Sequence, residues 1–267
     1  MTISMQGKIA LVTGGARGIG AAMATAFAAA GAKVMISDVL ADAGQATAEA
    51  IRKAGGEADF LVHDVRDEAA WEQTLAATVE RFGGFNTLVN NAGIEVSAPI
   101  TELPIEQLDR LMAVNVRGLF LGMKHGMRTM RPDGAAGKGG AILNLSSMAQ
   151  VRANPGTAAY AGTKAAVDRI TKIGAVEGGS FGWNIRVNSL YPGLIQTEML
   201  AHLLEQQIAM GFFKNAEEMN AYAMSKTPLA RLGTVEDVSN AAVFLCSDMA
   251  SFVTGIGLSV DGGMALT

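Results

Sequence analysis

The sequence predicts an α/β fold in which helices cover both faces of a parallel sheet, and three observations support this prediction. Short apolar segments typical of buried strands alternate with longer helix-like segments along the 267 residues. A glycine-rich turn joins the first of these segments to an alanine-rich helix. Apolar residues form 49% of the chain, enough for one large core. We therefore expect a doubly wound sheet in a single domain, residues 1–267, because no Pro/Ser-rich linker or charge run divides the chain.

Seven segments are expected to form the strands, since each is short, apolar and separated from the next by helix-like sequence. In chain order they are Ile9–Val12, Lys33–Ser37, Ala58–Val62, Thr87–Val89, Ala141–Leu145, Ile185–Leu190 and Gly257–Val260. Helices are expected between them, including one over the long segment Pro104–Met130. The stretch Leu194–Thr227 interrupts the regular alternation and is rich in Met, Leu, Phe and Ala.

The glycine-rich turn predicts a phosphate site. Gly14, Gly18 and Gly20 follow the first strand and precede the alanine-rich run 21–30. Glycine permits unusual backbone angles and a close ligand approach, and a helix amino terminus offers free N–H groups to a pyrophosphate. The spacing Gly-x-x-x-Gly-x-Gly differs from the commoner Gly-x-Gly-x-x-Gly fingerprint of dinucleotide sites.

Tyr160 and Lys164 are candidates for acid–base chemistry. Four residues apart on a helix, they lie on one face, and an ammonium beside a phenol is expected to lower the phenol pKa. The spacing alone is weak evidence, because exposed helices carry it by chance. Together with Ser147 and the glycine turn, it indicates redox chemistry.

Further motifs follow in a recognisable order. They are Asp64-Val65, Asn90-Asn91-Ala92-Gly93, Asn115, Asn144-Leu145-Ser146-Ser147, Ile185-Arg186-Val187-Asn188, Pro192-Gly193, Thr197 and Asp261-Gly262-Gly263. From Lys8 to Gly263 the chain resembles the short-chain dehydrogenases/reductases. The resemblance implies a Rossmann-type fold and an oxidoreductase that interconverts a secondary alcohol and a ketone with a nicotinamide dinucleotide.

The resemblance implies four catalytic residues, Asn115, Ser147, Tyr160 and Lys164. Tyr160 as phenolate would take the proton of the substrate hydroxyl, while Ser147 donates a hydrogen bond to the same oxygen. Lys164 would lower the tyrosine pKa and hold the nicotinamide ribose. In relatives, the position of Asn115 holds a water that extends a proton path from the lysine.

The cofactor site implied by the resemblance spans most of the motifs. Its residues are Gly14, Arg17, Gly18, Ile19, Gly20, Asp38, Asp64, Val65, Asn91, Ala92, Gly93, Tyr160, Lys164, Pro192, Gly193, Ile195 and Thr197. Asp38 ends the second strand, where a carboxylate accepts from a ribose hydroxyl and repels the extra phosphate of NADP. Arg17 favours NADP and an ordinary helix cap would also explain Asp38, but we expect NAD.

The substrate is expected to be bulky and mainly apolar, either alicyclic or steroid-like. Residues 194–227 resemble the family's substrate-covering lid, with an apolar stripe that includes Met199. Glu95, Gln150 and Tyr191 are further wall candidates beside Ser147 and Tyr160. For any one apolar residue, packing on its own protein is as good an explanation.

Two other functions remain open at this stage. A 3-oxoacyl-carrier-protein reductase would share the catalytic residues, but favours NADPH and a basic stretch after the Asn-Asn-Ala-Gly motif. Here that stretch is Ile94-Glu95-Val96-Ser97. A non-catalytic dinucleotide-sensing protein would not need the intact Asn115, Ser147, Tyr160 and Lys164.

Composition limits the partners. The net charge of −4 and the absence of a basic block argue against nucleic acid. The segment Met1–Gln6 is too short for a signal peptide, no apolar run predicts a membrane span, and the lone Cys246 suits a reducing cytoplasm. His63, His125 and His202 match no metal-ligand spacing. The resemblance implies a homotetramer built on helices around Leu103–Met130 and Thr157–Glu177.

Overall fold

A computed structural model describes residues 3–267 and shows a seven-stranded parallel sheet in the order β3-β2-β1-β4-β5-β6-β7. The strands are β1 (Ile9–Thr13), β2 (Lys33–Asp38), β3 (Glu57–Val62), β4 (Thr87–Asn90), β5 (Gly140–Leu145), β6 (Ile185–Pro192) and β7 (Gly257–Val260). All seven expected strands are confirmed to within two residues at each end. The expectation about Met1–Gln6 concerns in part Met1 and Thr2, which lie outside the described residues.

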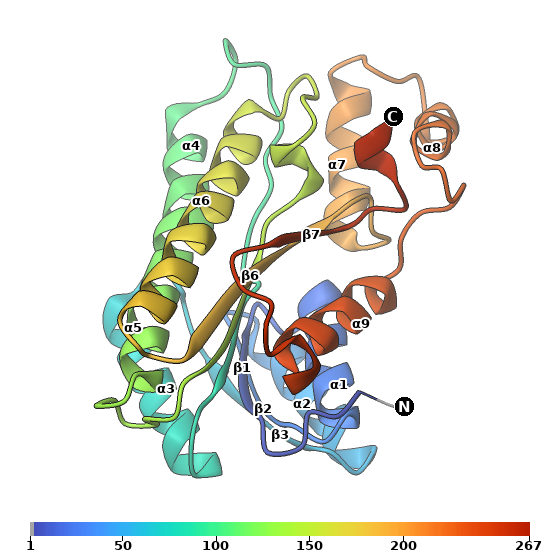
Figure 1. Cartoon of the computed structure of the whole chain (residues 1–267). Helices are drawn as coiled ribbons and strands as arrows, with labels where there is room; N and C mark the ends of the chain where they lie inside the picture. The colour runs from blue at the N-terminus through green and yellow to red at the C-terminus, as the bar shows by residue number, and fades with distance from the viewer. Residues whose placement is uncertain (1–2) are drawn as a thin grey trace.

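Helices cover both faces of the sheet, which Figure 1 shows nearly edge-on. On one face lie α1 (Gly18–Ala29), α2 (Ala41–Lys53) and α9 (Val235–Cys246). On the other lie α3 (Glu68–Phe82), α4 (Ile105–Leu111), α5 (Leu119–Met130) and α6 (Ala158–Ser180). The short 3-10 helices η2 (Met148–Gln150), η3 (Asp248–Ala250) and η4 (Met264–Leu266) lie in connecting segments.

The core consists of two apolar layers, one on each face of the sheet. Along β1, Leu11 and Val12 are both fully buried but belong to different layers, because successive side chains of a strand point to opposite faces. Trp71 is fully buried in one of these layers. Cys246 lies in the other, where burial raises the pKa of its thiol to about 12. A strand buried on both sides explains the continuous apolar runs of the sequence.

The segment expected to be one helix, Pro104–Met130, is interrupted by a π-helical turn. Between α4 and α5 the backbone forms η1 (Met112–Gly118), with Asn115 at its centre. The Asn115 side chain accepts a hydrogen bond from Ile94 N and donates one to Ile94 O, both at 2.9 Å. Wide turns of this kind commonly occur at functional sites, and here the turn ties the helix to the loop after β4.

Two helices occupy the irregular stretch after β6. They are α7 (Glu198–Ala209) and α8 (Ala216–Ser225), and they extend beyond the sheet in Figure 1. Thr197 caps α7 by accepting from Leu200 N, and Asn215 caps α8 by accepting from Glu218 N. Both helix starts are therefore encoded locally.

The outer faces of α5 and α6 expose apolar side chains, among them Phe120, Ile173 and Val176. The homotetramer expected on these helices stays a prediction. Within residues 3–267, no helix is both long enough and apolar enough to cross a membrane.

Candidate active site

A cavity of about 1090 Å³ opens at the carboxyl ends of the strands. It lies where β1 has neighbours reached in opposite directions along the chain, β2 and β4, which is the usual ligand position in doubly wound sheets. Most of the expected site residues line it: Gly14, Arg17, Gly18, Ile19, Gly20, Asp38, Asp64, Val65, Asn91, Ala92, Gly93, Glu95, Ser147, Tyr160, Lys164, Pro192, Gly193, Ile195, Thr197 and Met199. Asn115, Gln150 and Tyr191 do not.

The glycine turn forms one end of this cavity. Gly14 and Gly18 have φ angles of 61° and 57°, which favour glycine, and a Cβ on Gly20 would lie 2.2 Å from Gly14 O. The Asn91 amide clamps the turn by donating to Thr13 O at 2.9 Å and Gly14 O at 3.0 Å. In the described chain no side chain caps the start of α1, so its first N–H groups face the cavity.

Two carboxylates lie beyond the turn. Asp38 accepts from Ala16 N and Leu40 N, both at 3.1 Å, which fixes its orientation at the cavity wall. Asp64 pairs with Arg66 through the guanidinium Nε and Nη2, at 3.0 and 2.6 Å, and this hydrogen bonding lowers the Asp64 pKa. Arg66 also lines the cavity. No motif in the sequence predicted this position for it.

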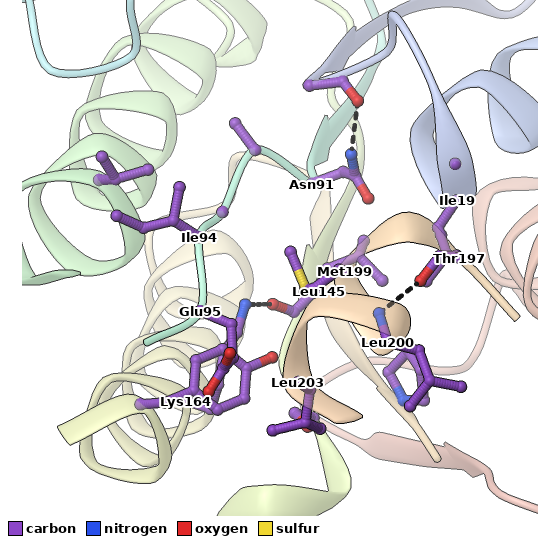
Figure 2. Close-up of a pocket in the computed structure, with 18 of the residues that line it drawn as sticks. Ile19, Asn91, Ile94, Glu95, Leu145, Lys164, Thr197, Met199, Leu200 and Leu203 are labelled. Carbon is purple, nitrogen blue, oxygen red and sulfur yellow. Dashed lines mark hydrogen bonds between the residues drawn. The ribbon is translucent and has the colours of Figure 1, made fainter. Parts of the chain in front are cut away.

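The other end of the cavity is formed by Ser147, Tyr160 and Lys164. Lys164 is buried, and its ammonium donates to Leu145 O at 2.8 Å and lies 5.6 Å from the centre of the Tyr160 ring. Figure 2 shows the Lys164–Leu145 contact at the floor of the pocket. The neighbouring Ser146 has a structural task instead, since its hydroxyl donates to Lys164 O at 2.9 Å. This bond holds α6 against the end of β5.

The expected lowering of the Tyr160 pKa was wrong for the chain as described. Burial raises the pKa of Tyr160 to about 12, against a smaller lowering from a hydrogen bond with Ser147, and the charge of Glu95 raises it further. Burial also lowers the pKa of Lys164 to about 8. The four-residue spacing on a helix shows that Tyr160 and Lys164 are neighbours. It does not show how strongly the removal of the phenol from water raises its pKa.

The Asn115 side chain is buried and does not line the cavity, and its expected role in a proton path stays a prediction. Besides its pair of bonds to Ile94, it donates to Thr163 Oγ1 at 3.1 Å. A Cβ on Gly93 would lie 3.4 Å from Asn115 Oδ1 and 3.5 Å from Lys164 Nζ. Asn115 therefore positions the loop that passes over the lysine, with its side-chain donors and acceptor engaged by protein.

Two of the expected substrate-binding residues, Gln150 and Tyr191, do not line the cavity. The Tyr191 side chain is buried, its hydroxyl donates to the Asp168 carboxylate on α6, and its ring covers Gly257 of β7. Burial raises the Tyr191 pKa to about 12, and a hydrogen bond with Gln150 acts in the opposite direction. Both side chains thus lie behind the cavity wall that they were expected to form.

Helix α7 closes the cavity on the side facing Tyr160. Met199, Leu200 and Leu203 line the wall, as Figure 2 shows, while other members of the expected apolar stripe, such as Met219, pack elsewhere. Gln206 lies on the same face of α7 and binds the loop after β4, accepting from Ser97 N at 2.6 Å. The sequence signal for Gln206 was its position three residues after Leu203 and seven after Met199.

Arg17 and Thr197 connect the glycine turn to α7. The Arg17 guanidinium pairs with Glu198, both largely exposed at the cavity mouth. Thr197 Cγ2 would be the nearest atom, at 3.8 Å, to a Cβ on Gly18. The Arg17–Glu198 ion pair therefore joins the glycine turn to the start of α7 at the mouth of the cavity. Among residues 3–267, no group of three or more His, Cys, Asp or Glu could hold a metal ion.

Comparisons with known proteins place this geometry among characterised chains. A family model described as enoyl-(acyl carrier protein) reductase matches residues 14–265. The chain is 38% identical over 270 residues to 2,5-dichloro-2,5-cyclohexadiene-1,4-diol dehydrogenase of Sphingobium indicum, covering 100% of this chain and 99% of the relative. It is 37% identical to the NADP-dependent (R)-specific alcohol dehydrogenase of Lentilactobacillus kefiri, covering 98% of each.

A solved structure is also similar along nearly the whole chain. It is a 7α-hydroxysteroid dehydrogenase in complex with NADH and 7-oxo-glycochenodeoxycholic acid, with a TM-score of 0.88 and 34% identity. The match covers 98% of this chain and 95% of that one.

Proposed function

The chain belongs to the short-chain dehydrogenase/reductase family and acts on CH–OH groups, and from this premise we propose that it interconverts a bulky, mainly apolar secondary alcohol and its ketone. The observation that carries the proposal is one continuous cavity with the glycine turn at one end and Ser147, Tyr160 and Lys164 at the other. A non-catalytic dinucleotide sensor would not require that second group of residues.

The cavity residues fit a nicotinamide dinucleotide. The turn leaves no room for a side chain at Gly20, and the first N–H groups of α1 would hold the pyrophosphate. Asp38 would bind the adenosine ribose, with Asp64 and Val65 near the adenine, while Pro192, Gly193 and Thr197 would border the nicotinamide. When bound, the nicotinamide supplies the hydride acceptor or donor.

The protein residues supply the proton chemistry. In the oxidation direction, the Tyr160 oxygen removes the proton from the substrate hydroxyl, and Ser147 donates a hydrogen bond to the substrate oxygen. Lys164 would hold the nicotinamide ribose, and its ammonium would favour the phenolate when the dinucleotide is bound. Loss of the proton requires lowering a phenol pKa that burial raises to about 12 in the unliganded chain.

The apolar part of the wall supports the substrate proposal. Met199, Leu200 and Leu203 of α7 present aliphatic side chains to the cavity that Tyr160 also lines. The relatives include one named for a cyclohexadiene diol and one that binds a bile-acid steroid, both ring compounds. An acyl-carrier-protein thioester is disfavoured by the acidic Glu95 on the loop after β4, where a basic stretch would suit that partner.

We expect kcat/KM to rise along a series from a short acyclic ketone to a cyclohexanone derivative to a steroid ketone. Each buried methylene contributes roughly 0.8 kcal/mol, or about fourfold in kcat/KM. The measurement is steady-state kinetics with each cofactor supplied in turn. A clear preference for the acyclic ketone or for a sugar would contradict the apolar-substrate proposal.

NAD is expected to be preferred over NADP by roughly 10- to 100-fold in kcat/KM, because Asp38 would face the 2′-phosphate of NADP. Asp38→Asn should reduce this ratio, whereas Asp42→Asn should leave it unchanged, since Asp42 is exposed and outside the cavity. Kinetics with both cofactors and one alcohol give the ratio. Equal or better use of NADP by the wild-type chain would show that Arg17 governs the choice.

A further inference from the structure

Glu95 is a carboxylate on the wall of the cavity, which also carries the aliphatic side chains of Met199, Leu200 and Leu203 from α7. It follows the Asn-Asn-Ala-Gly motif on the loop after β4, lines the cavity and is half-buried. Figure 2 shows it on the loop that faces α7, where Leu203 lies, and the Gln206 side chain of α7 reaches it. Its position on the substrate side of the cavity is unlike that of Asp38 and Asp64, which lie at the opposite end.

The contacts of Glu95 hold it in place without neutralising it. The Ser97 hydroxyl donates to Oε1, and the Gln206 amide donates to Oε2 at 3.4 Å. Within residues 3–267, neither a lysine nor an arginine forms a salt bridge with it. The charge of His202 acts on Glu95, but the His202 side chain is 66% exposed and pairs with Glu205.

This arrangement leaves hydrogen-bonding capacity on the carboxylate. A carboxylate accepts about four hydrogen bonds, and two protein donors reach this one, the second at a long distance. Because Glu95 lines the cavity, a hydroxyl group of a bound ligand can donate to the remaining lone pairs. Burial raises the pKa of Glu95, which agrees with an acceptor held partly out of water.

The site is also close to the reacting group. Glu95 and Tyr160 line the same cavity, and the charge of Glu95 raises the pKa of the Tyr160 phenol. A ring whose reacting carbon lies at Tyr160 therefore extends into reach of Glu95 or of the aliphatic wall of α7. The Glu95 carboxylate can accept a hydrogen bond from a hydroxyl group on that ring, and it repels an anionic substituent.

We propose that Glu95 accepts a hydrogen bond from a second hydroxyl group of the substrate, so that the preferred substrates are cyclic alcohols with one further hydroxyl on an otherwise apolar ring. This inference rests on the proposed function and adds the polar group that the substrate carries. The Gln206 amide of α7 donates to the same carboxylate and helps to orient it.

The test compares alcohols of nearly equal size, 4-methylcyclohexanol and the 1,2-, 1,3- and 1,4-isomers of cyclohexanediol. For the wild-type chain, at least one diol should exceed the methyl compound in kcat/KM. A hydrogen bond to a charged acceptor corresponds to roughly a 10- to 100-fold effect. Glu95→Leu should remove this advantage, so that the ratio of diol to methyl compound in kcat/KM falls, and Glu95→Gln should keep part of it.

Glu102→Gln is the matched control, because it removes a carboxylate from the same loop at an exposed position outside the cavity. It should leave the ratio of diol to methyl compound unchanged, and thermal unfolding of each variant checks the fold. Oxidation of 4-methylcyclohexanol with no diol favoured, or an unchanged ratio in both Glu95 variants, overturns the inference alone. A wild-type chain that oxidises none of these alcohols with either cofactor overturns the proposed function as well.

Discussion

Replacing Tyr160 with phenylalanine is expected to lower kcat by a factor of about 10² to 10⁴, the range typical of a positioned acid or base. The change removes one oxygen and keeps the ring that packs beside Lys164. Folding and dinucleotide affinity should therefore stay close to those of the wild-type chain. Single-turnover oxidation of a cyclic alcohol, with fluorescence titration of NADH, measures both quantities.

Tyr222→Phe provides the matched control. Tyr222 lies on α8, is 45% exposed and does not line the cavity, so loss of its hydroxyl should leave kcat unchanged. If Tyr160→Phe retained most of the wild-type turnover, proton transfer would have to pass through another group.

The same variant reveals the state of the phenol. A pKa of about 12 for Tyr160 means that the unliganded chain keeps this proton through about pH 10. The ordinary tyrosine pKa is about 10, so between pH 10 and pH 12 the folded chain keeps a Tyr160 proton that the unfolded chain has released. The free energy of unfolding therefore falls as the pH rises through this range. The ultraviolet difference spectrum between wild type and Tyr160→Phe should show no phenolate at neutral pH. A phenolate signal there would mean that Lys164 already controls the unliganded site.

Lys164→Met is expected to weaken dinucleotide binding by roughly tenfold and to lower kcat/KM by about 10² to 10³, because it removes a charge that serves both ribose and phenol. Methionine fills a similar volume but leaves Leu145 O without its donor. The two effects separate in an equilibrium titration with NADH and a steady-state assay. A loss of kcat with full NADH affinity would exclude the ribose contact.

Lys172→Met is the control for this change. Lys172 lies on the same helix, α6, and its exposed ammonium pairs with Asp168 at 2.7 Å. Surface pairs of this kind contribute about 0 to 1 kcal/mol to stability. The Lys172 variant should therefore keep wild-type kinetics and differ only slightly in thermal stability.

The features that the sequence predicts best depend on neighbours along the chain. The strands follow from apolar runs such as Ile9–Val12, and the turn at Gly14–Gly20 follows from the backbone angles that glycine permits. Helical spacing correctly places Tyr160 and Lys164 in one cavity. Each of these predictions needs information from fewer than ten residues.

The features that the sequence did not predict depend on contacts between distant parts of the chain. Tyr191 is turned away from the cavity by Asp168, 23 residues earlier on another element. Asn115 binds Ile94, 21 residues away, and the π-helical turn that presents it has no signature in helix propensity. The Tyr160 pKa depends on how completely the assembled walls exclude water, which no spacing rule contains.

The buried thiol of Cys246 makes the chain well suited to site-directed labelling. It is the only cysteine among the 267 residues. The thiolate is the form that attacks a thiol-reactive dye; a pKa of about 12 suppresses that form, and 1% exposure restricts access to it. A single cysteine introduced at an exposed position of α7, such as Ala201→Cys, would therefore carry the dye without removal of the native residue. Fluorescence from that position can then follow the movement of α7 during turnover in real time.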